Sequence, residues 1–211
     1  MTTRKIGKEE SVKIFTSARV NSIRNMNEAR SSWLISECIA GNDEAVATLV
    51  RQYETGVFRL ALSIVGDPAE ANEITQETFI AALRALPSYQ EQQSFRAWLY
   101  KIALNHSRSH LRKRKALERL RTTLTSIFQV ETQKQVLPEE AAIQNEREAS
   151  IWSTLNRLDE RYRTVVILRY FHELSIAEIS EVLSVNEGTI HSRLYSAREK
   201  LRKALKDLHK E

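Results

Sequence analysis

The chain has 211 residues, enough for one large or two small domains, and its mixture of 42% apolar and 28% charged residues is that of a soluble globular protein. Only 5 residues are Gly and 3 are Pro, which favours an all-helical (all-α) fold, and the formal net charge of +5 favours a polyanionic partner. The single cysteine, Cys38, excludes an intrachain disulfide framework. No stretch approaches the about 20 apolar residues that cross a bilayer, or the apolar core of a signal peptide, so we expect a cytoplasmic protein without membrane insertion.

Residues 1–30 are polar and basic. We expect them to form an N-terminal extension, either a solvated tail or a segment that touches DNA or a partner. The first helical pattern follows, with Trp33, Leu34 and Ile39 as its apolar stripe. Cys38 lies in this stripe and is expected to be a small buried residue rather than a ligand or nucleophile.

Two clearly bounded helices come next. Asn42 can cap the first, and the sequence Asp67-Pro68-Ala69-Glu70 is a strong start for the second, because the aspartate can cap and proline suits the first helical position. The outer face of this second helix is acidic, although the chain as a whole is basic. We expect the helix from Pro68 to Leu86 to bury Ile74, Phe79, Ile80, Leu83 and Leu86, and to expose Glu70, Glu73, Gln76 and Glu77.

A polar loop from Pro87 to Ser94 precedes a long helix that runs from Phe95 to about Leu120. One side of this helix is apolar and aromatic, and its exposed side is heavily positive. Contact with phosphates explains this density of cations, because each cation that meets a phosphate releases a counterion and no acidic residue occurs between Phe95 and Ala116. From Lys113 to about Glu140 polar residues interrupt any sustained apolar stripe, which makes this stretch the best candidate for a linker. Its apolar residues could still extend the helix or add another that packs on a neighbour; they are Leu117, Leu120, Leu124, Ile127 and Phe128.

The last part of the chain has the pattern of a helix-turn-helix that ends in a basic helix. Ser175 and Glu178 form a capping box, and Ser184-Val185-Asn186 has the length of the short turn, with Asn186 as a cap for the second helix. Asp159 can cap the helix that precedes this pair. Arg and Ser side chains on the second helix suit the major groove, but two amphipathic helices joined by a short turn also occur in proteins that never touch DNA.

Three segments in this order resemble the extracytoplasmic-function (ECF) sigma factors of bacterial RNA polymerase. They are E-A-N-E-I-T-Q-E-T-F-I-A-A-L-R-A-L, R-A-W-L-Y-K-I-A-L-N-H-S-R-S-H-L-R-K-R-K and L-S-I-A-E-I-S-E-V-L-S-V-N-E-G-T-I-H-S-R-L-Y-S-A-R. The resemblance implies an extension (1–30), sigma region 2 (31–115), a flexible linker (116–138) and sigma region 4 (139–211). Region 4 would be a four-helix, winged-helix-like domain. The implied partners are bacterial core RNA polymerase, promoter DNA and an anti-sigma factor.

The resemblance also implies three sets of binding residues. Glu70, Glu73, Gln76 and Glu77 would bind the clamp helices of the polymerase. The minus-ten element would be bound by Ser88, Tyr89, Gln90, Trp98, Lys101, Asn105, Arg108, Arg112, Lys113 and Arg114. The minus-thirty-five element would be bound by Gly188, Thr189, His191, Ser192, Arg193, Tyr195, Ser196, Arg198 and Lys200.

Several alternatives stay open at this point. Trp98 fits either the core or a role in strand separation. His106 and His110 have a spacing that can bind metal, but no carboxylate or cysteine accompanies them in the sequence, so we expect neither a metal nor another cofactor. A stand-alone helix-turn-helix regulator is the second candidate function. An enzyme is the third, and we expect no catalytic residue, since the chain lacks a Gly-rich phosphate loop and a Cys/His cluster.

Overall fold

A computed structural model describes residues 32–90, 94–128 and 152–208. Within these ranges the chain is helical and has no strand, which confirms the predicted all-α class. The predicted N-terminal extension, the middle of the predicted loop and part of the predicted linker lie outside the described residues. The helices are residues 32–39, α2 (Asp43–Val65), α3 (Pro68–Ala85), the 3₁₀ turn η1 (Leu86–Ser88), α4 (Phe95–Phe128), residues 152–156, α6 (Glu160–Val166), the π-helical turn η2 (Ile167–Phe171), α7 (Ile176–Leu183) and α8 (Glu187–Leu208).

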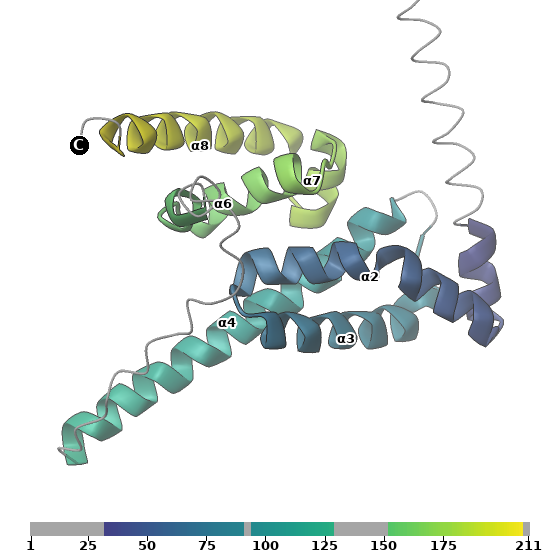
Figure 1. Ribbon diagram of the computed structural model, residues 1–211. Coiled ribbons are helices and arrows are strands. Elements are labelled where there is room, and N and C mark those ends of the chain that lie inside the picture. The colour runs from purple at the N-terminus through teal and green to yellow at the C-terminus, as the bar shows by residue number, and fades with distance from the viewer. Residues whose placement is uncertain (1–31, 91–93, 129–151, 209–211) are drawn as a thin grey trace, which may run out of the picture.

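The helices form two groups (Figure 1). In the first group α2, α3 and α4 pack on one another, and in the second group α6, α7 and α8 do so. The groups meet where α7 packs on α4 and η2 contacts α2. Figure 1 also shows α4 continuing well past the ends of α2 and α3, and α8 lying on the side of the molecule away from α3.

The predicted helix starts are confirmed at three places. Asn42 Oδ1 accepts hydrogen bonds from the backbone N–H groups of Glu44 (3.1 Å) and Ala45 (3.2 Å). Asp67 Oδ1 accepts from the backbone N–H of Glu70 at 2.8 Å, with Pro68 in the first helical position. Each cap satisfies N–H groups that have no partner within their own helix, which is why α2 and α3 begin at these residues.

The start of α7 has the full capping box, in which Ser175 Oγ accepts from the Glu178 N–H and the Glu178 carboxylate accepts from the Ser175 N–H. Asp159 stands directly before α6, but its side chain makes no cap hydrogen bond, so that part of the prediction was wrong.

The apolar stripe of the first helix is rotated by one position from the prediction. Trp33 is 61% exposed and Ile39 is 50% exposed, whereas Leu34, Ile35 and Cys38 are buried. The stripe that faces α2 therefore uses the one-, three- and four-residue spacings of Leu34, Ile35 and Cys38. Burial raises the pKa of the Cys38 thiol, with a further contribution from the charge of Glu37. A protonated, buried thiol fits the predicted packing role.

A similar shift occurs on α3. Ile80 is 52% exposed, contrary to the prediction, because its neighbour Phe79 occupies the inward position. The prediction was right for Ile74, Phe79 and Leu86, which are buried, and Leu83 is partly buried. Thr75 is buried as well, and its hydroxyl donates to the Ala71 carbonyl oxygen at 2.7 Å. A polar residue is tolerated on this face because its only donor is satisfied within the helix.

The predicted linker begins too early. Helix α4 continues to Phe128, so residues 116–128 extend the basic helix instead of leaving it. Residues 116–120 are exposed, with Leu117 at 67% and Leu120 at 55%, so the first part of this extension projects from the first group.

The second group contains the helix-turn-helix. The turn follows Leu183, and Ser184 adopts the left-handed conformation (φ 53°, ψ 46°) that is usually taken by Gly at this position. Within 152–208 there are four helical segments, as expected, if α6 and the π-helical turn η2 that continues it are taken as one. We expected a winged form of the motif, but the described residues contain no strand, so they form no β-hairpin wing.

Candidate nucleic-acid interface

One stripe of α4 carries most of the residues predicted to bind the minus-ten element. Trp98, Lys101, Asn105, Arg108 and Arg112 follow one another at spacings of three and four, which places them along one side of the helix. Lys101, Asn105 and Arg112 are exposed, and Trp98 and Arg108 are half-buried. The stripe thus presents one amide and two free-standing cations to solvent beside an aromatic ring.

An aromatic cluster lies at the start of this stripe. Trp98 packs against Tyr89 and Phe95, with ring centroids 5.2 Å and 5.5 Å apart, and Phe95 in turn contacts Tyr89 and Tyr53 edge-on. Trp98 is therefore part of the packing and still partly accessible, so the two interpretations of this residue do not exclude each other. Phe95 and Tyr53 belong to the cluster but were not predicted as site residues, because buried aromatic residues give no separate signal in the sequence.

Two other predicted residues lie in the loop after α3. The Ser88 hydroxyl donates to the carbonyl oxygen of Ala85 at 2.7 Å and so helps to end the helix. Gln90 is exposed, directly before residues 91–93, which lie outside the described part of the chain. Ser88 thus has a structural role in addition to the predicted one.

Two of the predicted DNA-binding arginines already have acidic partners. Arg114 donates to both carboxylate oxygens of Glu70 at 3.1 Å and to the Val65 carbonyl oxygen at 3.3 Å. Arg108 Nε donates to Glu160 at the start of α6, at 2.7 Å. Glu70 was predicted to bind the polymerase and Arg114 to bind the minus-ten element, and the fold pairs these two residues with each other.

The remaining acidic residues of α3 differ in their surroundings. Glu73 and Gln76 are exposed, while Glu77 is half-buried and accepts from His106 Nδ1 at 3.1 Å and contacts His110 Nε2 at 3.0 Å. Burial alone would raise the pKa of Glu77, but the hydrogen bonds and charges of His110 and His106 outweigh it and hold the pKa below its ordinary value. The expectation that no carboxylate accompanies the two histidines is therefore wrong.

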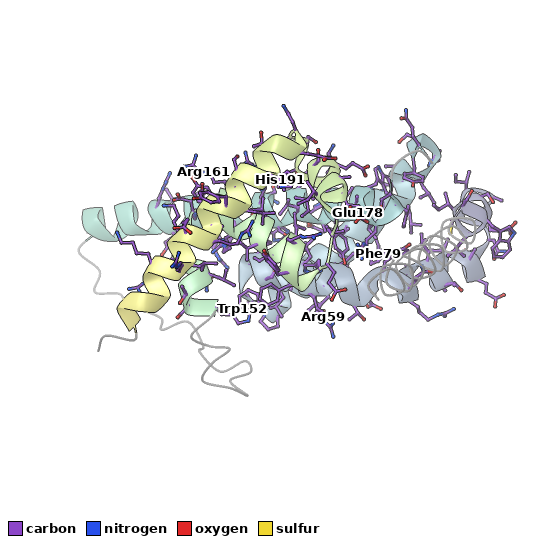
Figure 2. All side chains as sticks on the ribbon, turned by 90° about the horizontal axis from the view of Figure 1, so that it is seen from above. Arg59, Phe79, Trp152, Arg161, Glu178 and His191 are labelled. Carbon is purple, nitrogen blue, oxygen red and sulfur yellow. The ribbon has the colours of Figure 1, made fainter. Side chains whose placement is uncertain are left out.

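The predicted minus-thirty-five residues divide between two faces of α8. Gly188, His191, Ser192, Tyr195 and Arg198 are exposed and share one face. Figure 2 looks onto this helix from above, with α8 in front and His191 near its beginning. Thr189, Arg193 and Ser196 are half-buried on a second face, and Lys200 extends from that face over the ring of Tyr162, 5.4 Å from its centroid.

The contact between the two groups is polar at its centre. Glu178 of α7 accepts from Ser94 at 3.2 Å and from Arg96 at 3.3 Å, as well as from Ser175 of its own capping box. Burial raises the pKa of Glu178, but the hydrogen bonds from Ser175 and the charge of Arg96 outweigh it, so the pKa is lowered. The capping carboxylate of the helix-turn-helix is thus also the anchor of the second group on the first.

His172 lies in the same contact, edge-on to the ring of Tyr100 with centroids 5.3 Å apart. Burial, with the nearby charges of Arg96 and Arg59, lowers the pKa of His172 to about 4. Arg96 and Tyr100 lie on the opposite side of α4 from Trp98 and Asn105. The second group consequently leaves the amide and the aromatic ring of the minus-ten stripe accessible.

Comparison with known proteins matches both groups to one family. Residues 49–117 match the model for Sigma-70 region 2, and residues 148–201 match that for Sigma-70 region 4. The ECF RNA polymerase sigma factor SigW of Bacillus subtilis is 34% identical over 179 residues, which cover 82% of this chain and 96% of SigW. The chain belongs to the ECF sigma factors of RNA polymerase.

Two further comparisons agree with this assignment. The RNA polymerase sigma-H factor of Pseudomonas aeruginosa is 32% identical, with 88% of this chain and 99% of that protein covered. The structure of CnrH in complex with the cytosolic domain of CnrY matches with a TM-score of 0.62 at 25% identity, covering 82% of this chain and 96% of CnrH. The fold of this ECF sigma factor is thus shared along nearly the whole length of its relatives.

The family assignment confirms the resemblance found in the sequence. As an ECF sigma factor the protein acts in transcription initiation, which decides against the stand-alone regulator. Sigma factors are in general DNA-binding regulators and not enzymes. Among the described residues, none of the helices combines the length and the apolar character needed to span a membrane.

Proposed function

We propose that this ECF sigma factor binds bacterial core RNA polymerase through the acidic face of α3 and binds promoter DNA through α4 and α8. Residues 31–115 act as region 2 and residues 139–211 as region 4. Each contact is small, but tethering raises the effective concentration of the second once the first has formed. Because its partners are the polymerase and the chromosome, we also propose that the protein works in the cytoplasm, without catalytic residues of its own.

The observation that carries this proposal is the stripe of α4 with Trp98 at its head and Asn105 in its middle. A base that leaves the duplex needs an aromatic surface to stack on and an amide to recognise its edge. Trp98 and Asn105 supply these two groups on one side of one helix, and Lys101 and Arg112 stand beside them for the phosphates. This arrangement supports capture of a flipped base from the non-template strand of the minus-ten element.

The outward face of α8 supports the second DNA contact. His191, Ser192 and Tyr195 are exposed on the helix that follows the turn, and such a helix fits the width of the major groove. Arg198 lies farther along the same face, within reach of phosphates. We propose that this face recognises the minus-thirty-five element, and that Arg193 and Lys200 turn toward DNA in the complex.

A protein that masks these surfaces is also part of the proposal. CnrH, which shares the fold at 25% identity, was solved in complex with the cytosolic domain of CnrY. The amino-acid sequence itself implies an anti-sigma factor only through the family resemblance. We propose that an anti-sigma factor binds this chain and competes with the polymerase.

The proposal is tested by run-off transcription with purified core polymerase on a promoter library, with and without the sigma factor. Stimulation on a subset of templates is expected. On such a template Asn105→Ala should slow open-complex formation, measured by permanganate reactivity of unpaired thymines, about tenfold or more, since a lost base-specific hydrogen bond costs roughly 1–3 kcal/mol.

Binding of the closed duplex by the holoenzyme should change much less in the Asn105→Ala variant, because the amide acts only after the base has left the stack. Gln52→Ala is the matched control, because Gln52 is an exposed amide on a different helix, α2. Equal losses in duplex binding and in melting would contradict the role of Asn105, and an absence of stimulation on every template would contradict the proposed function as a whole.

A further inference from the structure

Helices α3 and α4 bring two carboxylates and two imidazoles together, far apart in the sequence but adjacent in the fold. Glu73 and Glu77 are one turn apart on α3, and His106 and His110 are one turn apart on α4, so each pair shares a helix face. The two helices pack directly on each other. Glu73, Glu77 and His110, all of types that bind transition metals, therefore meet at one place, and His106 contacts Glu77 beside them.

The distances within this cluster are close to those of a metal site. Glu77 Oε2 lies 3.1 Å from His106 Nδ1 and 3.0 Å from His110 Nε2. Ligand atoms of Glu73, Glu77 and His110 all lie within 4.8 Å of one another. In a tetrahedral zinc site with bonds of about 2.0–2.1 Å, neighbouring ligand atoms are roughly 3.3 Å apart. His106 lies outside this set of three but contacts Glu77, so it would have to turn further toward the ion than His110. Glu73 is exposed.

The cluster is also accessible. Three of its members, Glu77, His106 and His110, line a hollow between α3 and α4. The other lining residues are Ile80, Ala81, Ser109 and the cations Arg84 and Lys113. The His110 side chain is 12% exposed and that of Glu77 is 37% exposed, so the ligands are partly shielded but open to solvent on one side. The two cations are long and exposed side chains that can swing away from a bound ion.

The chemical types of the ligands select the class of ion. Mg²⁺ and Ca²⁺ prefer oxygen ligands alone, whereas two imidazoles with carboxylates suit Zn²⁺ and its neighbours Co²⁺ and Ni²⁺. The single cysteine, Cys38, is buried under a different helix and takes no part. The ligand set thus has the mixed nitrogen and oxygen character of exchangeable sites rather than the thiolates of closed structural zinc sites.

We propose that Glu73, Glu77, His106 and His110 bind one divalent transition-metal ion of the zinc class between α3 and α4. The ion also regulates the protein, because it occupies Glu73 and Glu77, two of the residues proposed to contact the polymerase. This second step rests on the proposed function, whereas the binding of the ion does not. Metal and core polymerase then compete for the same carboxylates.

Binding is tested on the full chain, stripped of metal, by titration with Zn²⁺ against a chromophoric chelator and with Co²⁺ by visible absorption. One equivalent should bind, and the Co²⁺ complex should show the absorption of a site with four nitrogen and oxygen ligands. His110→Ala and Glu77→Gln should each weaken Zn²⁺ binding at least about 100-fold, more than the 10–100-fold typical of groups that only support a ligand. His106→Ala and Glu73→Ala should weaken it less.

His191→Ala is the control, because His191 is exposed on α8, in the other group of helices. It should bind Zn²⁺ as the unmodified chain does, and circular dichroism should show that all variants remain helical. Absence of stoichiometric binding at micromolar Zn²⁺, or binding that His110→Ala and Glu77→Gln leave unchanged, would overturn the site.

Competition is tested separately by measuring the affinity for core polymerase with and without Zn²⁺. Zn²⁺ should weaken the complex of the unmodified chain several-fold and leave that of the His110→Ala variant unchanged. Equal affinities with and without Zn²⁺ would contradict the competition but not the metal site. Normal polymerase affinity of Glu73→Ala and Glu77→Gln in the absence of metal would contradict the proposed polymerase-binding role of these two residues.

Discussion

Several residues of this sigma factor both stabilise the fold and belong to the proposed interface. Gly188 is different, because the fold does not require a glycine at this position. A Cβ added at Gly188 would meet no atom within 4 Å, and its φ is not in the left-handed region, so packing does not require glycine there. By contrast, Ser184 adopts φ 53° at the turn, where glycine would be the easier residue. The glycine therefore stands where the fold does not need it, at the end of α8 that is proposed to face DNA.

The prediction at this scale is that Gly188→Ala separates stability from binding. The melting temperature should stay the same or rise, because alanine favours the helical state by up to about 1 kcal/mol over glycine. Affinity of the holoenzyme for promoters should fall, because the added methyl group holds the backbone away from the phosphate. A lower melting temperature, or unchanged promoter affinity in a filter-binding assay, would show that the glycine has a different role.

At the scale of elements, α4 is the helix on which the other parts depend. It supplies the stripe for DNA, the histidines of the proposed metal site and the residues that hold α7. It also runs to Phe128, so the helix is longer than the sequence indicated. Its cations are not equivalent, because Arg112 is exposed whereas Arg114 is held by Glu70 and the Val65 carbonyl oxygen.

The two arginines should consequently differ in their effect on DNA binding. Arg112→Ala should weaken holoenzyme binding to promoters of different sequence by a similar factor, and should reduce the slope of log affinity against log salt by about 1. Arg114→Ala should reduce this slope by less, since its charge is already partly neutralised. Promoter affinities measured at salt concentrations from about 50 to about 200 mM test this difference. A larger change of slope in Arg114→Ala than in Arg112→Ala would show that the Arg114–Glu70 ion pair does not reduce the contribution of Arg114 to DNA binding.

At the scale of the whole molecule, the two groups of helices are held together by a contact that depends on protonation. His172 is packed against Tyr100, with Arg59 on α2 and Arg96 on α4 nearby and Glu178 of α7 bonded to Arg96. The pKa of His172 is about 4, below its ordinary 6.5, so the unfolded or separated state binds the proton first. The stabilisation is full above pH 6.5 and is lost as the pH falls toward 4.

Acidification should therefore separate the two groups. The shift from 6.5 to about 4 corresponds to a loss of roughly 3 kcal/mol that is complete only when the pH lies below the folded pKa of His172. The lowered pKa of Glu178 adds a loss of the same sign only below its ordinary value of 4.5. Small-angle scattering should show a larger radius of gyration at about pH 5 than at about pH 7.5, because the first value lies below the ordinary histidine pKa and the second above it. His172→Gln, which cannot titrate, should reduce this change, and an equally large change in that variant would assign it to other groups.

The amino-acid sequence by itself determined the helical class, the caps at Asn42, Asp67 and Ser175, and the turn at Ser184, because each depends on residues within one or two turns of chain. It also determined the family, through three local motifs in a fixed order. Periodicity misplaced Trp33 and Ile80 by one position, since an apolar pattern does not specify which edge of the stripe meets a neighbouring helix.

Only the tertiary structure decided which side chains from different helices meet. Glu77 and the two histidines are separated by 29 and 33 positions, Glu70 and Arg114 by 44, and Arg96 and Glu178 by 82. No local pattern encodes such pairs, because they follow from the way α3, α4 and α7 cross when they bury their apolar faces. The proposed metal site and the pH-dependent contact both arise from these crossings.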